Sequence, residues 1–143
     1  MNFFTKNELE MELSEIQGKE KVEIKRTTET PEILLCKNEG KIKFEGRSLP
    51  ENPKDFYAPI KSWLSVYAEN PPQKTHVTFM FDYFNTSSSK VIMEIIDILK
   101  SIESRNGEVI IDWLYQEDDE DMLEAGEDFA SITDASFNYF SYY

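Results

Sequence analysis

Three short stretches near the start of the chain predict β-strands. The first and the third alternate apolar and charged residues, as strands with one solvated face do, and the second is apolar throughout. The stretches are residues 22–25, 33–35 and 42–45. Because successive side chains of a strand point to opposite faces, the apolar set of each stretch would face a common core. A turn at residues 37–40, in which Gly40 can take a positive φ, predicts that the last two strands form a hairpin.

Apolar residues at helical spacing follow a loop at residues 46–53 and predict the first long helix. Asn52 and Pro53 fit its N-cap and first helical position, because a proline there lacks only an N–H that would have no partner anyway. Asn70 and the two prolines after it end the helix. The predicted core-facing residues are Phe56, Ile60, Trp63, Leu64 and Tyr67.

The stretch from residue 75 to residue 115 organises the rest of the chain. Residues 77–84 and 109–115 are largely apolar at both alternating sets of positions, which favours central strands covered on both faces. Between them, residues 87–104 carry aliphatic side chains at helical spacing, and Asn106 and Gly107 supply a left-handed stop. A strand, a helix and a strand in this order predict a right-handed parallel βαβ unit.

The C-terminal part of the chain predicts one more helix and a packed aromatic segment. Acidic residues cluster where this helix would begin, and the helix dipole favours them there. Because residues 137–143 are densely aromatic, we expect some of them to pack on the domain. The predicted contacts of the last helix with the sheet are Met122, Ala125, Phe129 and Ile132.

Together these elements predict a single α/β domain over residues 22–143, preceded by an N-terminal extension of residues 1–21. The expected sheet is mixed, with about five strands, a central parallel βαβ unit and about three packed helices. In the extension, Leu9, Leu13 and Ile16 favour a short amphipathic helix. That helix would be either a surface appendage or a partner-binding element.

The charge of the chain excludes some partners. Formal net charge is −13, and residues 116–143 hold nine acids and neither Lys nor Arg. This balance argues against binding nucleic acid, whose phosphates need clustered Lys and Arg, and against anionic membrane surfaces. A basic protein partner or a metal ion remains open.

The remaining composition indicates a protein of a reducing compartment. Cys36 is the only cysteine, so no internal disulfide can form. The N-terminus lacks the apolar region of a signal peptide, and no apolar run reaches the roughly 20 residues of a membrane-spanning helix. We therefore expect a cytoplasmic protein that is a monomer when alone.

The junction at residues 83–90 is the first candidate site. It reads Tyr-Phe-Asn-Thr-Ser-Ser-Ser-Lys, where an aromatic strand runs into small hydroxyl residues and then into a helix. Asn85 or Thr86 can cap that helix. The same place suits a phosphate, because free N–H groups and the dipole at a helix N-terminus favour an anion. A plain helix cap and a phosphorylation site therefore both fit.

The acidic run at residues 117–121 is the second candidate site. In a parallel βαβ unit it lies at the same sheet edge as Thr86. Three interpretations are open: a solvated helix start, an electrostatic patch for a basic partner, and a magnesium site. The predicted magnesium ligands are Asp118, Asp119, Asp121 and Glu124. The sequence shows no nucleophile–base pair, P-loop or zinc spacing. The enzyme alternative is a metal-dependent hydrolase that uses the acidic run.

The junction resembles the signature of the SiaC family of bacterial regulatory phosphoproteins. The loop at residues 46–53, Gly-Arg-Ser-Leu-Pro-Glu-Asn-Pro, is similar to the loop before that family's first helix. Residues 118–122 and 126–129 are similar to its C-terminal region, and the likeness runs from about residue 30 to residue 132. The resemblance implies a STAS-like fold, similar to that of anti-sigma-factor antagonists.

The resemblance also implies a function. A dedicated kinase would phosphorylate Thr86, a PP2C-type phosphatase would remove the phosphate, and the unmodified protein would bind and activate a diguanylate cyclase that makes cyclic di-GMP. The chain would act as a partner-switching module with no catalysis of its own and no cofactor. A constitutive protein-binding scaffold, in which Thr86 is only a cap, is a further alternative. The predicted partner-binding residues are Asn85, Ser87, Ser88, Ser89, Lys90, Asp118, Asp119 and Asp121.

Overall fold

The computed structural model describes residues 16–143, which form one six-stranded mixed sheet with three α-helices. Most of the predicted N-terminal extension, including Leu9 and Leu13, lies outside the described residues. The strands are β1 (Lys21–Ile24), β2 (Glu32–Cys36), β3 (Lys41–Ser48), β4 (Lys74–Phe84), β5 (Glu108–Gln116) and β6 (Phe137–Tyr142). The helices are α2 (Pro53–Glu69), α3 (Thr86–Lys100) and α4 (Glu120–Thr133), with a short 3-10 turn η1 (Glu103–Arg105).

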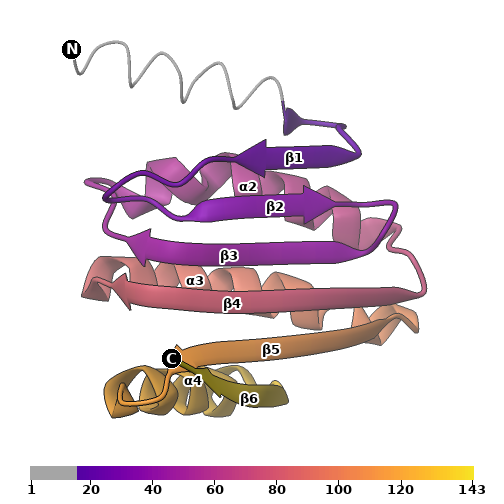
Figure 1. Ribbon diagram of the computed structural model, residues 1–143. Helices are drawn as coiled ribbons and strands as arrows, with labels where there is room; N and C mark the ends of the chain where they lie inside the picture. The colour runs from indigo at the N-terminus through magenta and orange to yellow at the C-terminus, as the bar shows by residue number, and fades with distance from the viewer. Residues whose placement is uncertain (1–15) are drawn as a thin grey trace, which may run out of the picture.

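The strands lie in the sheet in the order of the chain, from β1 to β6 (Figure 1). β1 and β2 pair antiparallel, as do β2 and β3. The pairs from β3 to β6 are all parallel. The predicted β2–β3 hairpin and the central parallel β4–α3–β5 unit are therefore confirmed.

The three helices cover only one face of the sheet, behind the strands in Figure 1. The prediction that β4 and β5 are covered on both faces is therefore wrong. On the helix side Val77, Phe79 and Phe81 of β4 are buried. On the other side His76 and Asp82 are exposed. The prediction failed because apolar residues also occur on the open face. Met80, for example, lies there and is only half-buried.

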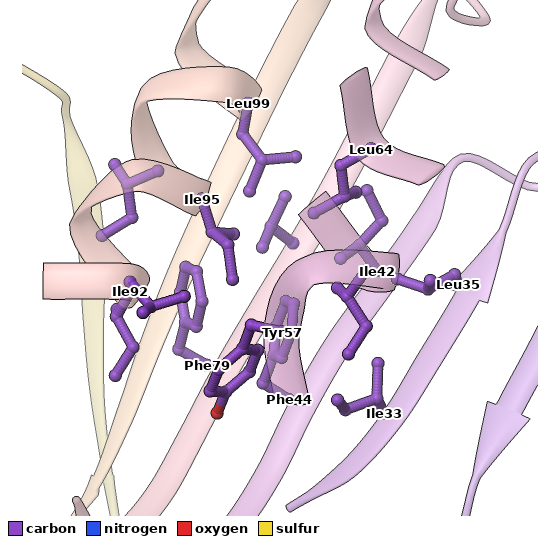
Figure 2. Packing of buried hydrophobic residues seen from close by; sticks show 14 of the residues in the cluster. Ile33, Leu35, Ile42, Phe44, Tyr57, Leu64, Phe79, Ile92, Ile95 and Leu99 are labelled. Atoms are coloured by element: carbon purple, nitrogen blue, oxygen red, sulfur yellow. The ribbon is translucent and has the colours of Figure 1, made fainter. Parts of the chain in front are cut away.

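The core lies between the sheet and the helices. Figure 2 shows Ile92, Ile95 and Leu99 of α3 and Leu64 of α2 directed at side chains from β2, β3 and β4. The rings of Phe44 and Phe79 stack with centroids 5.3 Å apart. All the predicted core residues of α2 are buried, which gives this helix its contact with the sheet.

Local capping signals fix where the helices begin and end. Asn52 caps α2 by accepting a hydrogen bond from the Asp55 N–H, and Pro53 occupies the first turn as predicted. Asn106, at φ 64°, is the left-handed residue after η1, whereas Gly107 has an ordinary φ. Gly107 is still needed, because an added Cβ would lie 2.5 Å from the Ile102 side chain.

Three elements differ from the prediction. β3 runs on to Ser48 through an irregularity after Gly46, so the start of the predicted loop is strand. The aromatic tail supplies a sixth strand, β6, which pairs with β5. On α4, Ile132 is 69% exposed instead of packed, and Thr133 is buried in its place. Among residues 16–143, we find no helix with the length and apolarity to cross a membrane.

Candidate regulatory site at the start of α3

The predicted site residues gather at one edge of the sheet. Because β3, β4 and β5 are parallel, the helices that follow them, α2, α3 and α4, all begin at the edge where those strands end. This is the left edge in Figure 1. Thr86 and the acidic run at residues 117–121 therefore share an edge, as topology predicted.

Asn85 is the N-cap of α3, and Thr86 is the first residue inside the helix. The Asn85 Oδ1 accepts a hydrogen bond from the Ser88 N–H at 2.9 Å and another from the Ser87 hydroxyl at 3.2 Å. The Thr86 side chain is exposed. Because Asn85 does the capping, the hydroxyl of Thr86 is left available at the positive end of the helix.

Ser88 lies beneath this surface and has no exposed area. Its hydroxyl donates to the Ser48 carbonyl at 3.1 Å and accepts from the Ser48 hydroxyl at 3.0 Å. The Ser48 hydroxyl also bonds the Tyr57 hydroxyl at 2.7 Å. The prediction that Ser88 contacts a partner is therefore corrected: its side chain is buried and holds α3 to β3 through Ser48, which in turn bonds α2. Ser89 is half-buried and Lys90 is exposed.

Tyr57 and Ser48 were not singled out from the sequence, although both support the site. Both side chains are fully buried. Burial raises the pKa of the Tyr57 phenol above its usual range, so it stays a neutral hydrogen-bonding group. Tyr57 follows Phe56 in an apolar helix pattern, which gave no sign that its hydroxyl is bonded to a strand.

Tyr83 was quoted as part of the junction but was not predicted as a contact. It is 54% exposed, although it lies in a strand just before Asn85. Exposed aromatic side chains are enriched at the energetic centres of protein interfaces. Because Tyr83 lies in an otherwise apolar strand, the sequence did not indicate that its side chain is exposed.

The acidic run is largely a helix start. Asp119 is the N-cap of α4 and accepts a hydrogen bond from the Met122 N–H at 3.0 Å. Asp118 and Asp121 are exposed on either side of it. In the part of the chain that the structure describes, no three His, Cys, Asp or Glu side chains form a group that could hold a metal ion.

The sequence matches the family described as SiaC family regulatory phosphoprotein over residues 24–142. The chain belongs to the SiaC family. This confirms the resemblance found in the junction and the loop before α2. A curated relative, an uncharacterised protein of Pseudomonas aeruginosa strain UCBPP-PA14, is 27% identical over 113 residues, which cover 79% of this chain and 88% of the relative.

Solved structures of SiaC confirm the fold. The crystal structure of apo-SiaC from Pseudomonas aeruginosa superimposes with a TM-score of 0.75 at 25% identity, covering 86% of this chain and 98% of that one. SiaC in the crystal structure of the Pseudomonas aeruginosa diguanylate cyclase SiaD with its activator SiaC gives a TM-score of 0.78 at 25% identity, covering 85% of this chain and 99% of that one. The α/β domain described above is thus the SiaC fold.

Proposed function

We propose that this chain is a partner-switching regulator of a diguanylate cyclase, controlled by phosphorylation of Thr86. Unmodified, it binds and activates the cyclase. A cognate serine/threonine kinase adds a phosphate to Thr86 and ends the activation, and a PP2C-type phosphatase reverses the modification. The protein itself performs no catalysis and acts in the cytoplasm.

The observation that carries this proposal is the exposed Thr86 at the first position of α3, in a member of a family of regulatory phosphoproteins. A kinase needs a reachable hydroxyl, and Thr86 offers one. A phosphate there adds about −1.5 to −2 charges and three acceptor oxygens. The helix N-terminus stabilises such an anion by roughly 0.3–1 kcal/mol, so the modification would leave the fold intact and change only the surface.

The proposal that the partner is a diguanylate cyclase rests on the similarity to SiaC of Pseudomonas aeruginosa. SiaC of Pseudomonas aeruginosa is the activator of the diguanylate cyclase SiaD, and the SiaC of that complex has the fold of this chain. The surface around Thr86, with the exposed residues Ser87, Lys90 and Tyr83, suits a protein partner. Asp118 and Asp121 lie exposed at the same edge and extend that surface.

The two other interpretations have less support. A metal-dependent hydrolase would need carboxylates that converge on an ion, but Asp119 is occupied in capping α4. The scaffold interpretation takes Thr86 as a cap, and this role belongs to Asn85.

The acceptor can be tested by incubating the protein with its cognate kinase and mapping the phosphate by mass spectrometry. We expect one phosphate, on Thr86, that is lost in Thr86→Val and retained in the matched control Ser87→Ala. The Thr86→Val variant should also stay bound to the cyclase in the presence of kinase and ATP. Phosphate on another residue, with Thr86→Val modified like the wild type, would remove Thr86 as the switch.

A further inference from the structure

The sheet has two edge strands, β1 and β6, and their chemistry differs. Natural proteins keep an edge strand from pairing with other chains by charged side chains, a proline, a bulge or a covering helix. β1 carries Lys21 and Glu23, which form an ion pair at 3.2 Å. Residues 135–143, which contain β6, hold five aromatic residues and neither a charged residue nor a proline. Charged protection is therefore present on β1 and missing from β6.

The backbone of β6 is paired on one side, as its place at the lower edge of the sheet in Figure 1 shows. Its ladder with β5 runs without a bulge from the first residue to the last. The Tyr142 carbonyl accepts a hydrogen bond from the Glu117 N–H, so the backbone groups of Tyr142 point toward β5. Because these directions alternate along a strand, the N–H and C=O groups of Phe137, Tyr139 and Ser141 point away from β5. In the described part of the chain, no other strand pairs with β6.

The position of α4 leaves this edge uncovered. Gly126 of α4 lies against the indole of Trp113 in β5, and the Phe129 ring meets the Phe84 ring of β4 at 5.6 Å. The helix also meets β6, where the Tyr139 hydroxyl donates to the Gly126 carbonyl at 3.5 Å. Since α4 packs on strands toward the centre of the sheet, a further strand can lie beside β6 without meeting this helix.

The partner that this edge fits is a second copy of the chain. At a net charge of −13 most of the surface repels a second copy, and the uncharged β6 is a strip where two copies can meet. A strand can pair antiparallel with its own copy about a two-fold axis. With the axis at Tyr139, Phe137 lies opposite Ser141 of the second copy. All three outward-pointing residues of β6 then exchange hydrogen bonds with the other copy.

We propose that the chain forms a two-fold symmetric dimer through β6, so that two sheets join into one continuous sheet. In this register Phe140, which is 52% exposed on the open face, lies beside Asn138 of the second copy and is partly covered by it. The monomer expected from the sequence is then the form at low concentration. Because the pairing runs along the outer side of β6 and Thr86 follows β4, the dimer leaves both Thr86 hydroxyls exposed. The proposal therefore does not depend on the proposed function.

Like charges beside the two-fold axis limit the strength of this dimer. Glu127 of α4 lies near Tyr139, where its charge adds to the effect of burial in raising the pKa of the phenol. Two copies bring two such acids toward each other. Their repulsion is screened by salt, since the Debye length falls from about 10 Å at 0.1 M to about 3 Å at 1 M. The dimer should therefore tighten as salt is added, whereas a dimer held by ion pairs would weaken.

The test is sedimentation velocity of the unmodified full chain over a wide range of protein concentration and at two salt concentrations. Ser141→Pro removes an N–H that points away from β5, so the ladder with β5 keeps its hydrogen bonds. We expect it to weaken dimerisation by about tenfold or more, because one hydrogen bond is lost from each copy. Glu23→Pro is the matched control on β1. Its N–H also points away from the sheet, because the Glu20 carbonyl accepts from the Lys37 N–H of the next strand.

A second variant keeps the test decisive if circular dichroism shows that Ser141→Pro does not fold. Phe140→Lys puts on β6 the residue that natural edge strands use against pairing, and it should leave the protein monomeric. Thr28→Lys, an exposed change at the other side of the sheet, adds the same charge and should dimerise like the wild type. The proposal would be overturned by a wild-type chain that is monomeric at every concentration. A dimer that weakens with salt, or that forms equally well in Phe140→Lys, would also overturn it.

Discussion

The first turn of α3 gives neighbouring polar side chains three different physical roles. Asn85 satisfies a backbone donor, Thr86 faces solvent, and Ser88 is buried in a hydrogen-bond network with Ser48. The separation of these roles matters for signalling. Thr86, the proposed phosphate acceptor, is exposed and does not cap the helix, whereas Ser88, which bonds α3 to β3, is fully buried.

Substitutions at the cap should separate stability from signalling. Asn85→Ala removes the acceptor of the Ser88 N–H, so we expect the free energy of unfolding to fall by about 1 kcal/mol. Thr86→Val should change it by less than about 0.5 kcal/mol, because the side chain is exposed and does not cap. Urea denaturation followed by circular dichroism measures both. A larger loss for Thr86→Val than for Asn85→Ala would contradict this division of roles.

The buried hydroxyls can be tested in the same way. Tyr57→Phe leaves the Ser48 hydroxyl without its 2.7 Å partner, and we expect a loss of about 1 kcal/mol of stability. Tyr83→Phe removes a hydroxyl from a side chain that is 54% exposed and serves as the control, with little or no loss. Equal stability of Tyr57→Phe and the wild type would show that the network contributes nothing.

These residues also show what the sequence could reveal. Asn52 was predicted as a cap, and Asn85 was one of two candidates with Thr86, because each asparagine bonds an N–H only three residues ahead. Asn106 was readable as part of a left-handed stop for the same local reason. The burial of Ser88 was not readable, because its partner Ser48 lies 40 residues away on another strand.

Among the elements, α4 is fixed to the sheet through a tight contact between Gly126 and Trp113. The Trp113 indole N–H donates to the Met122 carbonyl at 2.9 Å, and its ring is fully buried. A Cβ at Gly126 would lie 2.5 Å from the indole nitrogen. The helix can approach this closely only because residue 126 has no side chain.

Gly126→Ala should therefore destabilise the protein although alanine is the better helix former. We expect a net loss of about 1–2 kcal/mol, because overpacking outweighs the gain in helix propensity. Ser131→Ala, at an exposed position of the same helix, should be neutral or slightly stabilising. Thermal melts of the three proteins decide the matter, and a Gly126→Ala protein that melts above the wild type would show that α4 is not held this tightly.

On the open face of β3, ion pairs predict a dependence of stability on pH. Hydrogen bonds from Lys43 and then from Arg26 lower the pKa of Glu45 from its ordinary 4.5, although partial burial opposes the shift. A lowered pKa in the folded state stabilises the fold above the ordinary pKa. That stability is lost as the pH falls through the lowered value.

Glu45→Gln should therefore be less stable than the wild type near neutral pH, and the difference should shrink as the solution is acidified below the ordinary pKa of 4.5. Urea titrations across this range measure the difference. Glu103→Gln, an exposed change on η1, should show no such trend. A constant difference between Glu45→Gln and the wild type at every pH would rule out this ionic contribution.

At the element scale, the sequence predicted the elements that show a clear apolar periodicity. It did not predict the strand that depends on pairing with another part of the chain. α2, α3 and the parallel β4–α3–β5 unit follow from apolar spacing. β6 becomes a strand only by pairing with β5, and its aromatic residues show no clear alternation. The open face of β4 carries the half-buried Met80 together with the exposed His76 and Asp82. The apolar Met80 led to the wrong prediction that this face is also covered.

At the scale of the whole molecule, a one-sided sheet leaves three helix starts at a single edge. Near that edge lie the exposed residues Thr86 and Tyr83, and Asp119, which caps α4, lies along it. The chain belongs to the SiaC family and shares its fold with the activator of a diguanylate cyclase. These two findings support the proposal that this edge binds a protein partner. Because the site lies on rigid helix ends, we expect the switch to act through surface charge.

The most direct test of this account is the initial rate of cyclic di-GMP synthesis by the cognate diguanylate cyclase with equimolar regulator added. Unmodified protein should raise the rate, and protein carrying phosphoserine at position 86 should leave it at the level of the cyclase alone. Protein with serine at position 86 is the control and should activate like the wild type. Equal activation by the phosphorylated and unphosphorylated forms would contradict the central claim that charge on residue 86 sets the output.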